Sequence, residues 1–347
     1  MGVWYASRED VKAALDFKET ARNNGQVDRA VESASRAVEG LTHRRFYPET
    51  DTRYFDWPDD DYGRPWRLYL HQHEVISVTT LSSGGDTISA SDYFLEPVND
   101  GPPYSRIEID LSSSASFGGG STHQRDITVT GVFGYSADTT AAGALAEALD
   151  SSETDVDVTD SSLIGVGDII VCESEYMTVT GRSMLDTTQD IGADLASSNA
   201  AVTVAVTTGS SYTVGETILI DAERMLIVDI AGNNLIVKRA FDGSVLAAHT
   251  SGADVYAPRT LTVVRGSLGT TAAAHDTATA VRKHEVPALI RQLTIAEAVS
   301  DLMNQSAAYA RTVGSGDNER EASGRALRSL RDQVKARYGR NARVRAV

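Results

Sequence analysis

Residues 166–177 read VGDIIVCESEYM, and residues 214–225 read VGETILIDAERM, which aligns with the first stretch without a gap. Each copy has two short apolar runs around an acidic turn, a pattern that indicates two short strands. A repeat of this kind inside one chain indicates a small structural unit that has been duplicated. The middle of the chain is therefore predicted to consist of small all-β modules.

A second pair of similar stretches follows the first pair. Residues 235–239 read LIVKR and are followed by Ala247-Ala248-His249, whereas residues 261–265 read LTVVR and are followed by Ala273-Ala274-His275. The first pair is offset by 48 residues and the second by 26, although a simple tandem repeat would give a single offset. We interpret this order as one β-module, at about 206–256, inserted inside another copy of itself. The alternative is that residues 185–205 are a degenerate copy of the second half of the module, and that residues 257–282 are an additional copy of that second half.

The distribution of aromatic residues indicates where the domains begin and end. Residues 1–137 hold 17 of the 23 Phe, Trp and Tyr residues, whereas 138–282 hold four and a single proline, Pro258. We expect 1–137 and 283–316 to form one core, 138–282 to be an inserted β-module domain, and 317–347 to be a basic C-terminal tail or helix.

Helical periodicity is present at both ends of the chain. Ser7 and Asp10 resemble a capping box at the start of a first helix. A second helix is predicted to end near His43, and a third to begin with Pro287 in its first turn and to end at 314–316. Alternating runs predict strands at 52–55, 67–70, 75–81, 93–95, 106–111 and 126–132. The predicted fold class is α+β, with a helical connector core, an antiparallel β-rich portion, an inserted all-β repeat domain and an extended basic C-terminal tail.

The charge of the chain is unevenly distributed. The 347 residues carry a net charge of −16, yet residues 319–347 contain nine basic and three acidic residues, which leaves −22 on the preceding 318. So acidic a body disfavours tight binding to nucleic acid. The single cysteine, Cys172, excludes an intrachain disulfide. Because the N-terminus has no secretory pattern and no apolar run is long enough to span a bilayer, we expect no contact with membranes.

Candidate metal and catalytic residues are few. His71 and His73 are alternate residues of a predicted strand next to Glu74 and are the best metal candidates. Because the sequence identifies no third metal ligand, we interpret them as ordinary sheet residues. Asp56 and residues 59–61 lack the spacing of a calcium loop. Gly118-Gly119-Gly120 precedes a strand and is interpreted as a turn. We predict no metal, no cofactor and no enzymatic activity.

The repeated units also place charged residues at matching positions. Glu175 and Glu223 occupy the two front halves, and Arg239 and Arg265 occupy the two back halves. One interpretation is a sugar-binding or ion-binding site in each module. The preferred interpretation is a structural ion pair that closes each small β-module.

Several stretches resemble the head-to-tail connector proteins of long-tailed bacteriophages. Residues 7–15 and 27–46 resemble the opening helices of that family, above all where they end in Arg44-Arg45-Phe46-Tyr47-Pro48. Residues 92–97 and 125–135 resemble strands of such proteins. The resemblance covers roughly 1–135 and 283–315. It rests on degenerate sequence motifs and is a similarity to the family, not to one particular member.

The resemblance implies a structural virion protein, a head-to-tail adaptor in the head–tail connector region. It implies a ring of identical copies, commonly a dodecamer, with the portal above, a tail-side connector or stopper protein below, and DNA passing through the lumen without tight binding. We expect the basic tail to dock on the portal through Arg320, Arg325, Leu327, Arg328, Leu330, Arg331, Val334, Lys335, Arg337 and Arg340.

Two other classes of protein are weighed against the adaptor. One is a tail-tip or baseplate protein whose β-modules bind a host glycan. The inserted segment holds few aromatic residues for a sugar platform, namely Tyr176, Tyr212, Phe241 and Tyr256. The other is a hydrolase, which would need a paired acid and base, and no pattern in the sequence places two carboxylates together.

Overall fold

The computed structural model describes residues 2–15, 24–57, 64–306, 312–313, 320–321 and 325–340. It is mostly antiparallel β-sheet, with 37% of residues in strands and 21% in four short helices. The predicted α+β fold with a helical connector core is therefore wrong. The described residues fall into two compact units, the first within 1–38, 139–267 and 271–333 and the second within 39–138, 268–270 and 334–347.

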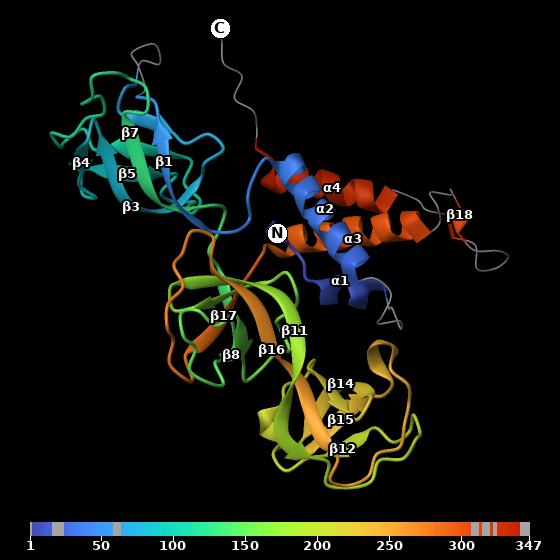
Figure 1. The fold of residues 1–347 in the computed structure, drawn as a ribbon. Coiled ribbons are helices and arrows are strands. Elements are labelled where there is room, and N and C mark those ends of the chain that lie inside the picture. The colour runs from blue at the N-terminus through green and yellow to red at the C-terminus, as the bar shows by residue number, and fades with distance from the viewer. Residues whose placement is uncertain are drawn as a thin grey trace. The chain divides into compact units, whose positions relative to one another are not determined.

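The four helices of the described residues are α1 (Arg8–Leu15), α2 (Asn24–Thr42), α3 (Ala288–Ser306) and α4 (Arg325–Tyr338) (Figure 1). Helix α1 begins as predicted, because the Ser7 amide donates to Asp10 and the Asp10 amide donates to the Ser7 hydroxyl, at 3.0 and 3.1 Å. In the first unit, helix residues pack with Trp4 and Val166 into one small apolar cluster. A two-stranded sheet of β18 (Thr312–Val313) and β19 (Arg320–Glu321) lies between α3 and α4 in the sequence.

Most of the first unit is a single ten-stranded sheet, in which the two repeated modules follow one another. The outer module contains β8 (Thr139–Ala144), β9 (Asp155–Asp157), β10 (Ile169–Cys172) and β17 (Ala280–His284). The inner module contains β12 (Thr203–Ala205), β13 (Thr217–Ile220), β14 (Glu223–Ala231) and β15 (Asn234–Lys238), with short 3-10 turns at Gly209–Ser211 and Phe241–Gly243. Two long strands, β11 (Glu175–Asp190) and β16 (Asp254–Ser267), pair with each other and belong to both modules (Figure 1).

Each module has its own apolar core. The core of the outer module is built from residues between 142 and 179 together with residues between 261 and 281. The core of the inner module is built from residues between 191 and 255, all of which lie between those two stretches in the sequence. The chain thus completes the front half of one module, forms a second module, and returns to finish the first.

The second unit contains two smaller antiparallel sheets. One has the order β1 (Glu49–Phe55), β7 (Ile127–Phe133), β3 (Val75–Ser83) and β4 (Asp86–Ile88). The other has the order β2 (Arg67–Tyr69), β6 (Arg106–Ile109) and β5 (Tyr93–Glu96). Strand β7 alternates between buried and half-buried residues along its whole length, which is the period-two pattern that the sequence predicted.

The error in fold class has a physical cause. Strands β1 to β7 bury their apolar and aromatic side chains against one another and form a core without help from a helix of the first unit. Helices α1 and α3 instead pack around Trp4 and Val166, the latter a residue of the outer module. Helical periodicity located the helices correctly, but it carries no information about which strands they would cover.

Candidate functional site

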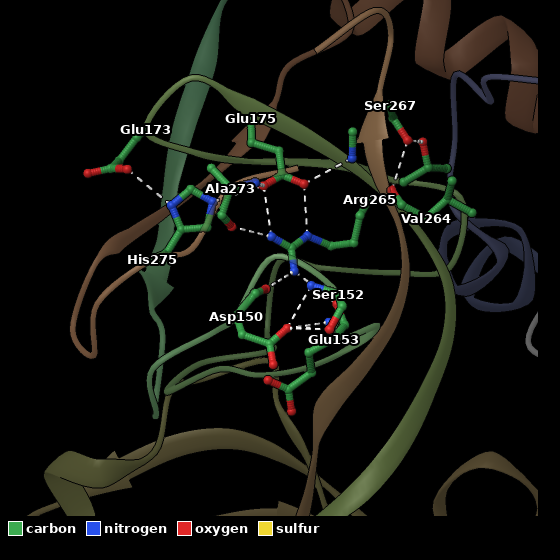
Figure 2. A network of polar contacts seen from close by, with 12 residues as sticks. Asp150, Ser152, Glu153, Glu173, Glu175, Val264, Arg265, Ser267, Ala273 and His275 are labelled. Atoms are coloured by element: carbon green, nitrogen blue, oxygen red, sulfur yellow. Dashed lines mark hydrogen bonds and ion pairs between the residues drawn. The ribbon is translucent and has the colours of Figure 1, made fainter. Parts of the chain in front are cut away.

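The charged residues at matching positions of the two modules form a pair of buried networks, which we call the clasps. In the outer module, Arg265 of β16 grips Glu175 of β11 with two parallel hydrogen bonds, from Nε at 2.8 Å and from Nη2 at 2.9 Å (Figure 2). Only 1% of the Glu175 side chain and 6% of the Arg265 side chain are exposed. This forked arrangement is the strongest form of a carboxylate–guanidinium pair.

Backbone groups complete the outer clasp. The amides of Gly266 and Ala273 donate to the Glu175 carboxylate at 2.9 and 3.0 Å. Arg265 donates in return to the carbonyl oxygens of Asp150, Glu153 and Ala273. Burial alone would raise the pKa of Glu175, but the hydrogen bonds that it accepts outweigh burial and hold the pKa at about 2.

A histidine closes each clasp. In the outer module, His275 Nε2 lies 2.9 Å from a Glu175 oxygen, and Nδ1 lies 3.1 Å from a carboxylate oxygen of the exposed Glu173 (Figure 2). The His275 backbone also exchanges two hydrogen bonds with Leu149, at 2.8 and 2.9 Å. The segment that carries Ala273 and His275 is thereby fastened to the strand that begins at Glu175.

The inner module repeats these contacts almost atom for atom. Arg239 grips Glu223 with two bonds of 2.7 Å, and 1% and 0% of the two side chains are exposed. The amides of Ala240 and Ala247 donate to Glu223 at 2.9 and 3.0 Å, and hydrogen bonds from these groups hold the pKa of Glu223 at about 2 although burial would raise it. His249 lies 3.0 Å from Glu223.

Two further details match between the clasps. The inner histidine, His249, lies 2.6 Å from the exposed Asp221, as the outer histidine lies against Glu173. The inner arginine, Arg239, donates to the carbonyl oxygens of Ala196 and Ala201, as Arg265 does to two carbonyl oxygens of its own module. The interpretation of the four charged residues as structural ion pairs is confirmed.

The geometry limits what the clasps can do chemically. Each carboxylate already accepts hydrogen bonds on both oxygens from a guanidinium, two amides and an imidazole, so its lone pairs are occupied. A general base needs a free lone pair within reach of a substrate proton. Neither glutamate meets this requirement, and both clasps act as structural fasteners.

A second ion pair holds the inner module to the outer one. Arg259, on β16 between the two modules, donates to Glu216 from Nε at 2.8 Å and from Nη2 at 2.7 Å. Glu216 also accepts from the Ser161 hydroxyl at 2.9 Å. Glu216 matches Asp168 of the outer module, which pairs with Lys283 at 2.7 Å. The sequence repeat located both acidic positions but not their different partners.

The residues predicted to dock on the portal lie on β19, on α4 and, in the case of Arg340, just after α4. Val334 is fully buried and is therefore not available to a partner, while Leu327 and Leu330 are half-buried. Arg331 pairs with Glu297, and Arg340 pairs with Glu74 at 2.8 Å. Arg320 belongs to β19. The exposed basic side chains of α4 that have no ion-pair partner among the described residues are Arg325, Arg328, Lys335 and Arg337.

The metal candidates of the sequence do not converge on a site. No group of three or more His, Cys, Asp or Glu side chains among the described residues is arranged to hold a metal ion. His73 lies beside Arg53, and burial together with nearby arginines lowers its pKa. The amides of Gly118 and Gly120 donate to the Asp126 carboxylate, so this turn is occupied from within the protein. Residues 59–61 lie outside the described residues, as do 314–316, the predicted end of the third helix.

Over the described residues, none of the helices has the length and apolar character needed to span a membrane. In comparisons with known proteins, no family model, no curated protein and no solved structure matches this chain.

Proposed function

We propose that this chain is a structural virion protein, the head-to-tail adaptor that forms a ring beneath the portal of a tailed phage and joins the capsid to the tail. The observation that carries the proposal is α4, a helix with exposed arginines attached to an otherwise acidic chain. The clasps support a structural role, because the buried carboxylates that would be the best candidates for catalysis are saturated by internal hydrogen bonds.

Helix α4 has the properties of a presented docking element. Its C-terminal end is anchored in the second unit by Tyr338, which is 7% exposed and whose ring packs edge-on against Phe46 and Tyr135. In the first unit, Arg331 pairs with Glu297. A helix fixed in this way presents Arg325 and Arg328 to a partner without first having to be ordered, which reduces the entropic cost of binding. A partner with an acidic surface, such as the lower face of the portal, fits this helix.

The other parts of the proposal follow from the sequence resemblance. The adaptor assembles as a closed ring, commonly a dodecamer, through head-to-tail contacts between identical copies. A tail-side connector or stopper protein binds below. DNA passes through the lumen, where the excess negative charge of the chain disfavours tight binding along the wall.

The test uses native mass spectrometry with the cognate portal protein. We expect the purified chain alone to be mainly monomeric and to be recruited in many copies when portal is added. Arg328→Glu reverses one exposed charge of α4 and should weaken recruitment, whereas Arg125→Glu reverses an exposed charge that does not belong to α4 and should not. An isolated chain that forms a stable dimer and has no affinity for portal would contradict the proposal.

A further inference from the structure

The histidine of the outer clasp has a carboxylate at each of its two ring nitrogens. Nδ1 of His275 lies 3.1 Å from a Glu173 oxygen, and Nε2 lies 2.9 Å from a Glu175 oxygen (Figure 2). Only 1% of the His275 side chain is exposed, so water has little access to either nitrogen. A neutral imidazole has a proton on one nitrogen only, whereas an imidazolium ion donates from both.

The inner clasp has the same arrangement. Nδ1 of His249 lies 2.6 Å from an Asp221 oxygen, Nε2 lies 3.0 Å from a Glu223 oxygen, and none of the side chain is exposed. Asp221 stands at the position that Glu173 has in the first copy of the repeat. Both copies therefore place two acids around one buried ring, although the exposed acid is a glutamate in one copy and an aspartate in the other.

Hydrogen bonding in this arrangement is complete only if the ring carries two protons. An ionised carboxylate can only accept hydrogen bonds, and the pKa of about 2 keeps Glu175 and Glu223 ionised at all but the most acidic pH. A neutral ring would direct a bare lone pair at one of its two carboxylates. A buried acceptor that faces another acceptor loses its hydrogen bond and is repelled.

The charges of the outer clasp also favour a charged ring. Glu175 and Arg265 cancel, and Glu173 leaves one negative charge, which a protonated His275 balances. Burial raises the pKa of the neighbouring Cys172 thiol to about 12, so this thiol is neutral and does not alter the balance.

The inner clasp has the same excess, since its glutamate and arginine cancel and Asp221 remains. Charged groups at the edges of the clasps do not supply the missing positive charge. Asp150 is an exposed carboxylate bound by the amides of its own turn. Arg224 and Asp242 of the inner module pair at 3.2 Å and cancel. Lys238 is exposed to solvent.

We propose that each clasp histidine is a pH-sensitive latch, which holds its module closed only while the ring is an imidazolium ion. Loss of the second proton removes one hydrogen bond and places a lone pair against a carboxylate, so the latch opens on the alkaline side. His275 and His249 also exchange paired backbone hydrogen bonds with Leu149 and Leu195, at 2.8 and 2.9 Å in each module. The segment that carries each histidine is therefore the part that loosens. This proposal does not depend on the adaptor function, because it concerns only the chemistry within each module.

The latches and the clasp glutamates respond at opposite ends of the pH scale. An ordinary histidine in an unfolded chain loses its second proton at about pH 6.5. A latch contributes its full stabilisation below that pH and loses it as the pH rises and the folded ring gives up the proton. The glutamates, with a pKa of about 2, lose their contribution only in acid.

The experiment observes the two rings separately, by NMR of the full chain labelled with 15N-histidine. The nitrogen signals distinguish a ring with two protonated nitrogens from a ring with one bare nitrogen. We expect both clasp rings to be doubly protonated at neutral pH and to lose a proton only as the pH is raised. A clasp ring with one bare nitrogen at neutral pH would overturn the proposal.

Two variants of the exposed acids assign the signals and serve as controls for each other. In Asp221→Asn, the side-chain amide can donate to a ring that has lost its Nδ1 proton, so His249 should become neutral at a pH lower by about half a unit, as the loss of one exposed ion pair predicts. Glu173→Gln should have this effect on His275 alone. The two acids are 63% and 67% exposed, so neither change removes a buried group. A variant that leaves its own ring unchanged, or that changes both rings equally, would also contradict the latch.

Discussion

The inner clasp allows a quantitative prediction, in which Glu223→Gln keeps the size of the side chain but removes its charge. The variant leaves the Arg239 guanidinium buried without a counter-ion, and loss of one partner from a buried pair costs about 3–5 kcal/mol. The pKa of Glu223 gives an independent figure, because a drop from the ordinary 4.5 to about 2 corresponds to about 3 kcal/mol of stabilisation. We expect the free energy of opening the inner module to fall by about 3 kcal/mol.

Hydrogen exchange of backbone amides measures this change locally. The amides of Ala240 and Ala247, which donate to Glu223, should exchange much faster in the variant. The equivalent amides of the outer module, Gly266 and Ala273, should be almost unchanged, since the outer core is built from other residues. Equal acceleration in both modules, or a loss below about 1 kcal/mol, would refute the view that each clasp closes its own module.

A matched control exists within the outer clasp. Glu173 contacts His275 as Glu175 does, but 67% of its side chain is exposed. Because an exposed ion pair contributes at most about 1 kcal/mol, Glu173→Gln should change the opening free energy of the outer module by less than that. Glu175→Gln should cost about 3 kcal/mol in the same assay.

Three further predictions concern acid, the C-terminal helix and the repeated turns. In the folded protein the pKa of both clasp glutamates is about 2, well below the ordinary value of 4.5. Their contribution to the free energy of unfolding is therefore complete above pH 4.5 and is lost as the pH falls from there toward 2. Urea titrations at a series of pH values should show this decline. Tyr338→Ala should destabilise the second unit by about 3–5 kcal/mol, because this ring packs edge-on against Phe46, and calorimetry measures the loss. Gly167→Ala should be far more destabilising than Gly215→Ala in the same calorimetric assay: both have positive φ, but only at 167 would the new methyl group meet the Trp4 ring, at 2.1 Å.

Local features of the fold were predictable from the sequence, and long-range ones were not. The capping residues of α1, the proline in the first turn before α3 and the alternation of β7 all act over a few residues, and each element forms where it was predicted. The helical connector core was not a local feature. It depended on which strands the helices would cover, and strands β1 to β7 have enough apolar side chains to close a core of their own.

The clasps were partly predictable because duplication provides a comparison within one chain. Matching positions identified the glutamates and arginines; the second carboxylates, Glu173 and Asp221, also match between the two copies, but their contact with a histidine far along the chain was not predicted. For α4, Val334 was predicted to dock on the portal, but its sequence context did not indicate that the protein itself buries this residue.

The way in which β11 and β16 connect the modules has a consequence for how such a chain can change during evolution. The two strands, 16 and 14 residues long, run antiparallel, so the inner module leaves and re-enters its host at neighbouring positions of one sheet. This position of the outer module is therefore a natural insertion point. A whole inner module can be lost, exchanged or added there without displacing the other strands of the outer module. Descendants of this chain should therefore differ in length by entire modules at this point. Each added module provides a further insertion point of the same kind.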